Sequence, residues 1–334
     1  MGPATGSEGG RRAVWREGAR DLPAAACRSE RMVVVWPRDL NTYHSVFGGY
    51  VMQRVDALAT ALAADVSGLR CVTAHLDRLT FTAGIGAFQR MRLTAWATRT
   101  FRTSMEVQVD VQGEDSASGR TWQTAHATLT VVGLDDGGRP APLPQVVPST
   151  PREWEDHRLA AERREKRLAL PDPVPAEFGA PPAARADALC LESTSRVVPA
   201  AHAAENGQAS AGWILALADE LAAISASRHA GVPTVTVAVD QVAFRRPVPI
   251  GDILTLRSYL TCTFRTSLEV RVDAFWRPRY GRAVETVAHC AFTFVAVGAD
   301  GRPVPLTGLV PQGEREEALA RVAWERRRER LGAG

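Results

Sequence analysis

The chain contains one domain-length pattern twice. Residues 100–110 read TFRTSMEVQVD and residues 263–273 read TFRTSLEVRVD, so nine of eleven positions are identical at an offset of 163, the difference between 263 and 100. This register holds without a gap from about residue 48 to residue 167, and it pairs Asp56 with Asp219. We call residues that are 163 positions apart twins. A period this long indicates a duplicated domain rather than a short solenoid repeat.

Composition excludes several classes of protein. Of the 334 residues, 45% are hydrophobic and 23% are charged, as in ordinary globular proteins. The net charge of +3 is small, and no basic stripe interleaved with aromatic residues suggests a nucleic-acid partner. No apolar run approaches the length of a membrane span. The five cysteines have no C-x-x-C spacing, so we expect neither disulfides nor a metal site, and a cytoplasmic location fits best.

Each copy is predicted to contain one long helix followed by antiparallel strands. The helices cover residues 48–64 and 211–229, where apolar side chains recur at helical spacing. The strands are expected at residues 32–35, 72–76, 91–99, 104–112 and 123–134, and in the second copy at 196–198, 235–239, 254–262, 267–275 and 286–297. One helix followed by such strands indicates an α+β fold in which a sheet wraps around the helix.

The repeat also sets the expected domain boundaries. We predict a flexible N-terminal extension at residues 1–31, without the continuous apolar core of a secretory signal. A first domain covers residues 32–168, and a Pro/Ala-rich linker covers residues 169–191. A second domain covers residues 192–334 and ends in a basic helix.

The start of the first long helix has the features of an oxyanion site. Gly48 and Gly49 open the helix, and a helix N-terminus presents unpaired N–H groups that glycine leaves accessible. Asp56 lies seven residues after Gly49, about two turns further along the same stripe. The Gly-Gly pair alone is equally consistent with a tight turn and close packing.

With its surroundings, this stretch resembles the hotdog-fold acyl-CoA thioesterases. The pattern is Asn41, eight residues before Gly49, then Phe47-Gly48-Gly49 and Asp56. Residues 235–252, 266–270 and 291–303 also look like strands of that family, and the resemblance is closest to the cytosolic acyl-CoA hydrolase group with its tandem members. It implies two tandem hotdog domains, each a long central helix wrapped by an antiparallel sheet, paired as an intramolecular pseudo-dimer.

The resemblance implies that each active site takes its Asn from one domain and its Asp from the other. The twin of Asp56 is Asp219, whereas the twin of Asn41 is Ala204. One site, Asn41 with Asp219, is therefore expected to be complete, and the site of Asp56 lacks its amide. Asn206 lies two residues from the required position and reads as a turn residue before Gly207.

The roles that follow are those of thioester hydrolysis. Asp219 could act as a general base toward water or attack the carbonyl directly, and the sequence does not separate the two. Asn41 is expected to orient water or the carbonyl, and the Gly49 amide to hold the oxyanion, with Gly48 shaping the turn. The competing interpretation of Asp219 is an ion pair with a helix arginine such as Arg228.

Further residues have supporting or alternative roles. His44 either packs the loop or touches the substrate. By resemblance, Ser104 and Ser267 lie near the pantetheine and phosphates of coenzyme A. Several arginines are candidates for its phosphates, because guanidinium groups bind phosphate bidentately: Arg99, Arg102, Arg245, Arg246 and Arg265. His126 and His289 are expected to be structural.

The predicted function is hydrolysis of acyl-CoA to a free acid and coenzyme A, without a cofactor beyond the coenzyme A of the substrate. The alternatives are a non-catalytic acyl-CoA binding or sensing protein, and a hotdog hydratase or dehydratase on acyl thioesters. By resemblance we expect a homo-oligomer, with a trimer of double-hotdog chains as its form.

Overall fold

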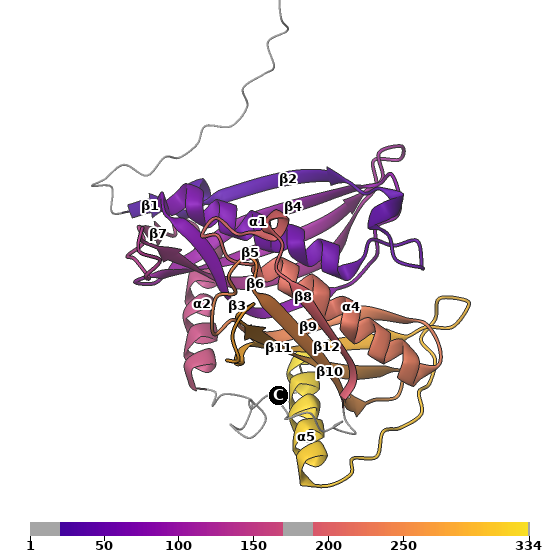
Figure 1. Cartoon of the computed structure of the whole chain (residues 1–334). Helices are drawn as coiled ribbons and strands as arrows, with labels where there is room; N and C mark the ends of the chain where they lie inside the picture. The colour runs from indigo at the N-terminus through magenta and orange to yellow at the C-terminus, as the bar shows by residue number, and fades with distance from the viewer. Residues whose placement is uncertain (1–20, 170–189, 333–334) are drawn as a thin grey trace, which may run out of the picture.

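The computed structural model describes residues 21–169 and 190–332 and is built around a ten-stranded antiparallel sheet (Figure 1). The strand order is β2-β4-β5-β6-β3-β9-β12-β11-β10-β8. The first half contributes β2 (Arg28–Val34), β3 (Arg70–Phe81), β4 (Arg90–Thr100), β5 (Ser104–Glu114) and β6 (Thr121–Leu134). The second half contributes β8 (Cys190–Val197), β9 (Thr234–Ala243), β10 (Ile253–Thr263), β11 (Ser267–Arg277) and β12 (Glu285–Ala296).

The two halves join at the centre of this sheet. β3 pairs with β9, with His75 opposite Ala243 and Leu79 opposite Val239. On either side of this pair, each strand of the first half has its twin strand at the equivalent position of the second half. The predicted α+β fold of two tandem, paired units is therefore confirmed.

Two long helices lie side by side on one face of the sheet (Figure 1). They are α1 (Gly48–Ser67) and α4 (Ala211–Ala230), close to the predicted ranges. Each ends at a left-handed glycine, Gly68 at φ 69° and Gly231 at φ 64°, a conformation that glycine adopts without steric cost. Among the helices that the structure describes, none has the length and apolar character of a membrane span.

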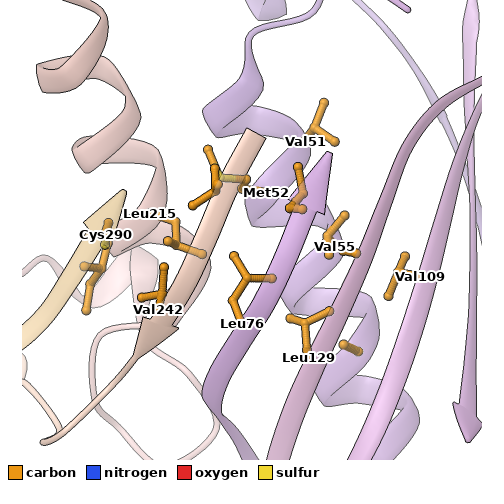
Figure 2. Close-up of a cluster of buried hydrophobic side chains, with 14 of the residues drawn as sticks. Val51, Met52, Val55, Leu76, Val109, Leu129, Leu215, Val242 and Cys290 are labelled. Carbon is orange, nitrogen blue, oxygen red and sulfur yellow. The ribbon is translucent and has the colours of Figure 1, made fainter. Parts of the chain in front are cut away.

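The side chains beneath these helices form one core that crosses the boundary between the halves. Figure 2 shows Val51, Met52 and Val55 of α1 in the same cluster as Leu215 of α4. Leu76 and Val242 lie between them, on the two central strands. Burial of each such side chain contributes about 1.5–3 kcal/mol. The halves therefore stabilise each other and do not have separate cores.

Two further helices dock on the opposite face. In β5, Met105, Val107 and Val109 face the core, and the alternation of a strand turns Glu106 to the other side. There Glu106 accepts hydrogen bonds of 2.6 and 3.0 Å from Arg163 of α2 (Pro151–Ala169).

The same contact recurs in the second half. The twin Glu269 accepts bonds of 2.6 and 3.0 Å from Arg326, the twin of Arg163, in α5 (Glu314–Arg330). Each outer helix is thus held by an ion pair to a buried glutamate.

The N-terminal region differs from the prediction. Residues 21–31 are not a flexible extension, because β1 (Asp21–Pro23) pairs with β7 (Gln145–Val147) and β2 starts at Arg28 beside β4. Cys27 between these strands is buried. An edge strand exposes most of its side chains, so Arg28–Val34 carries no clear apolar alternation. Residues 1–20 and 170–189 lie outside the described residues, and with them most of the predicted linker at 169–191, whose ends belong to α2 and β8.

Removal of one docking arginine is expected to destabilise the fold. Arg326→Ala leaves Glu269, which is 0% exposed, as an unpaired buried charge, and this should cost about 3–5 kcal/mol of unfolding free energy. Urea denaturation followed by circular dichroism measures the loss. The control is Arg158→Ala on the exposed side of α2, where Arg158 pairs with Glu155, and it should cost less than about 1 kcal/mol. Equal losses in the two variants would contradict the docking role of Arg326.

Candidate functional site

The N-terminus of each long helix packs directly against the other helix. A Cβ atom on Gly49 would lie 2.9 Å from the Cα of Ala216, and one on its twin Gly212 would lie 2.8 Å from the Cα of Gln53. Only glycine permits so close an approach of two backbones. The contact places the aspartate of each helix at the first turn of its partner.

Asp219 is completely buried beside the start of α1. Its Oδ1 accepts a 2.8 Å hydrogen bond from Thr236 Oγ1, while Oδ2 has no hydrogen-bond partner among the described residues. Burial raises the pKa of Asp219 to about 7, although the Thr236 hydroxyl and the Gly49 amide act in the opposite direction. A carboxyl group with this pKa can accept a proton near neutral pH.

Gly48 keeps the space next to this carboxyl group open. A Cβ atom there would lie 3.0 Å from Asp219 Oδ2, which is a hydrogen-bonding distance. Any other residue at this position would block the approach of a small polar atom to Oδ2.

Asn41 lies in the turn before α1 and has a fixed side-chain orientation. Its Oδ1 accepts hydrogen bonds from the amides of Tyr43 at 2.9 Å and Ser45 at 3.2 Å. Only oxygen can accept from two N–H donors, so the amide has one possible orientation. Nδ2 therefore remains as the group that Asn41 can offer to a ligand as a donor.

Asn41 and the surroundings of Asp219 meet in one cavity of about 680 Å³, the Asn41 cavity. Asn41 and Gly48 reach it from the first half, and Glu220 and Thr236 reach it from the second. Asn41 and Thr236, the hydrogen-bond partner of Asp219, thus line the same cavity between the two halves, while Asp219 itself does not line it.

The twin position holds a second cavity of about 540 Å³, lined by Asp56 and Ala204, the Asp56 cavity. Both carboxylate oxygens of Asp56 are engaged, Oδ1 by Thr73 Oγ1 at 2.6 Å and Oδ2 by the Gly212 amide at 2.8 Å. Burial nevertheless raises the pKa of Asp56, against these two bonds.

The first turn of α4 is also capped by a side chain. Ser210 Oγ accepts a 3.2 Å bond from Trp213 N, whereas its twin Phe47 makes no side-chain cap on α1. The equivalent amide of α1, Tyr50 N, donates instead to the backbone oxygen of Phe47 at 3.0 Å, so both amides have a partner.

Comparison with known proteins agrees with this architecture. The model of the thioesterase superfamily matches residues 43–119 and 206–279, one segment in each half. An uncharacterised acyl-CoA thioester hydrolase of Bacillus subtilis is 35% identical over 144 residues, 42% of this chain and 84% of that protein. The chain belongs to the thioesterase superfamily.

Longer members of the superfamily align with both halves of the chain. Acyl-coenzyme A thioesterase 11 of Mus musculus is 30% identical over 298 residues, 85% of this chain and 49% of that protein. The cytosolic acyl coenzyme A thioester hydrolase of Homo sapiens is 27% identical over 310 residues, 88% of this chain and 80% of that protein. The chain spans about half the length of several curated relatives, 49% and 56% in two cases.

The structure places several of the predicted site residues away from the positions that their expected roles require. His44 is exposed at φ 58° in a left-handed turn, like its twin Gly207 at φ 74°, and does not line the Asn41 cavity. Gly49 is buried and turns its amide toward Asp219, so Gly48, not Gly49, reaches the cavity. Arg228 pairs with Glu192 and not with Asp219.

Of the predicted contacts to coenzyme A, Arg245 and Arg246 line the Asp56 cavity, but four others line neither cavity. Arg102, Ser104, Arg265 and Ser267 lie at or just before the starts of β5 and β11. Ser267 instead accepts a 3.0 Å bond from Arg327 Nη1. Their contact with substrate stays a prediction.

The two strand histidines have structural partners. His126 and its twin His289 each place Nδ1 2.7 Å from an aspartate, Asp110 and Asp273 respectively. Within the described ranges, no three His, Cys, Asp or Glu side chains gather as they would around a metal ion.

Thr236 was not among the site residues predicted from the sequence. Its hydroxyl lowers the pKa of Asp219 against the larger effect of burial, and its twin Thr73 does the same for Asp56. The matched threonines, each 17 residues after its aspartate, were a signal that could have found the pair.

A methyl group at the helix contact is expected to separate the two helices. Gly49→Ala places Cβ 2.9 Å from the backbone of Ala216 and should lower the unfolding free energy by about 1–3 kcal/mol. Thermal denaturation measures the change. Gly308→Ala is the matched control, because no atom lies within 4 Å of its added Cβ, and it should be neutral. A neutral Gly49→Ala would show that the close approach is not required.

Proposed function

We propose that the chain is an acyl-CoA thioesterase, which hydrolyses acyl-CoA to a free carboxylic acid and coenzyme A in the Asn41 cavity. The observation that carries the proposal is the unpartnered Oδ2 of buried Asp219, a carboxyl group with a pKa of about 7, whose partner Thr236 lines one cavity together with Asn41. The names of the mouse and human relatives support this choice of substrate class.

The reaction follows from the donors and acceptors at the cavity. Ionised Asp219 takes a proton from water, and the water oxygen forms a bond to the thioester carbonyl carbon. Asn41 Nδ2 donates to the carbonyl oxygen, and the positive end of the α1 helix dipole stabilises the negative charge that develops there. The C–S bond then breaks, the carboxylic acid is released, and the proton on Asp219 passes to the departing thiolate.

Attack by water is favoured over direct attack by the carboxylate. Asp219 has no exposed surface, and the approach to Oδ2 runs beside Gly48. Water fits such an approach more easily than the carbonyl carbon of a bulky thioester. This supports general-base catalysis over an anhydride intermediate.

One competent site per chain follows from the difference between the twin cavities. Ala204 provides no amide, and the Gly212 N–H is engaged by Asp56. A binding or sensing protein would have no use for one open and one closed aspartate, so this asymmetry supports an enzyme. We also propose a cytoplasmic location and a homo-oligomeric assembly. The human relative is named a cytosolic hydrolase, which supports the location.

Asp219 and Asp56 are expected to respond differently to the same substitution. Asp219→Asn removes the base and should lower kcat by about 10²–10⁴-fold, measured as thiol release from short, medium and long acyl-CoAs. Asp56→Asn should reduce kcat by less than about tenfold. If the two variants lose activity equally, the single-site assignment is wrong.

Stability distinguishes this loss of activity from unfolding. The pKa of Asp219 is raised from 3.8 to about 7 in the folded state, so its contribution to stability is present below about pH 4 and is lost as pH rises through 7. Asp219→Asn should therefore be at least as stable to urea as the wild type at pH 8.

The pH dependence of the wild type is expected to report Asp219. kcat/KM should fall about tenfold per pH unit below pH 7, because protonated Asp219 cannot act as a base. Thr236→Val removes a bond that favours the carboxylate, so the acidic limb of the profile should move to higher pH. Thr73→Val at the twin aspartate is the control and should leave the limb unmoved. A shift in the control alone would assign the titration to Asp56.

A further inference from the structure

The two cavities differ in charge. Arg54, Arg245 and Arg246 line the Asp56 cavity, where they outnumber the acidic residues Asp56 and Glu205. The twins of the three arginines are Leu217, Thr82 and Ala83, and the last two line the Asn41 cavity. Among the described residues, Glu220 is the one charged residue that lines the Asn41 cavity. Cationic side chains have therefore accumulated around the cavity that lacks the amide.

The arginines are positioned by their neighbours. The guanidinium carbon of Arg54 lies 4.6 Å from the ring centroid of Tyr50, and Arg54 is exposed. Arg246 stacks on Trp276 at 3.8 Å and pairs with Glu285. Arg245, also exposed, follows directly after the cavity residue Phe244. A guanidinium group held by stacking loses little entropy when it binds phosphate.

The inner wall of the Asp56 cavity suits a ligand that has both apolar segments and amide groups. Val72, Ile214, Phe244 and Val248 contribute apolar surface. Gln208 also lines the cavity, and its Oε1 is buried without a hydrogen-bond partner among the described residues. A buried acceptor without a partner is costly, and an amide N–H of a ligand would satisfy it.

Hydrolysis is not supported in this cavity. Ala204 replaces the amide, Ser210 caps the first turn of α4, and both oxygens of Asp56 are engaged. The Asp56 cavity thus has features that favour binding of a phosphorylated ligand. The groups that would catalyse hydrolysis are absent or already hydrogen-bonded.

We propose that the Asp56 cavity is a second, non-hydrolytic site, which binds coenzyme A or the coenzyme A portion of an intact acyl-CoA. The phosphates contact the arginines at the mouth, and the pantetheine amides extend toward Gln208. The choice of ligand rests on the proposed function, while the cationic site itself does not.

The test is the binding stoichiometry of a thioether, S-butyl-coenzyme A, which cannot be hydrolysed. Isothermal titration of the wild type should give two equivalents per chain. The double variant Arg54→Leu/Arg245→Thr introduces the twin residues, which the same fold accommodates in its other half. It should weaken one of the two sites by at least about tenfold, because charge-assisted hydrogen bonds contribute about 1.5–3 kcal/mol each.

Control and back-up variants make the result decisive. Arg282→Ala/Arg302→Ala removes the same charge at exposed positions that line neither cavity, and should retain two equivalents. Gln208→Ser, again a twin residue, tests the same site if the arginine variant does not fold, and should weaken the same equivalent. One equivalent in the wild type, or two unchanged equivalents in both site variants, overturns the proposal.

Parallel assays separate this inference from the proposed function. Acyl-CoA hydrolysis with one bound thioether refutes the second site and leaves the thioesterase assignment intact. Two bound equivalents without hydrolysis of any acyl-CoA support the second site and refute the assignment. Titration with coenzyme A alone distinguishes a site for the free product, which gives two equivalents, from one that also needs the acyl chain.

Discussion

The close approach of α1 and α4 is the constraint on which the site depends. Gly49 against Ala216 and Gly212 against Gln53 leave no room for a side chain at either glycine. This contact brings each aspartate to the N-terminus of the opposite helix, where a separate half would present an incomplete site. It also explains why the two halves share one core and one sheet.

Duplication within one chain allows the two sites to diverge. In a dimer of identical units, a change at the position of Asn41 would affect both sites at once. Here Ala204 affects only the cavity of Asp56. The twin residues Ser210 and Phe47 also differ, as do Arg54 and Leu217. The two cavities therefore differ in the capping of the adjacent helix and in charge.

Much of the fold could be predicted because the repeat supplies every signal twice. The helices at 48–67 and 211–230 and the central strands carry regular apolar patterns. The pairing of Asn41 with Asp219 came from a family resemblance, since nothing in periodicity places residues so far apart side by side. The edge strand Arg28–Val34 was not fully predicted, because exposed strands lack apolar alternation. The hydrogen bond of Thr236 was not predicted, because it depends on the three-dimensional placement of residues distant in sequence.

The twin aspartates differ in their hydrogen bonds, although they occupy equivalent positions on α1 and α4. Both are buried, and burial raises the pKa of each. Asp56 accepts one bond at each oxygen, so its charge is compensated and its lone pairs are engaged. At Asp219, Thr236 donates to Oδ1, and Oδ2 has no hydrogen-bond partner among the described residues. This difference supports the proposed role of Asp219 as a base and a structural role for Asp56.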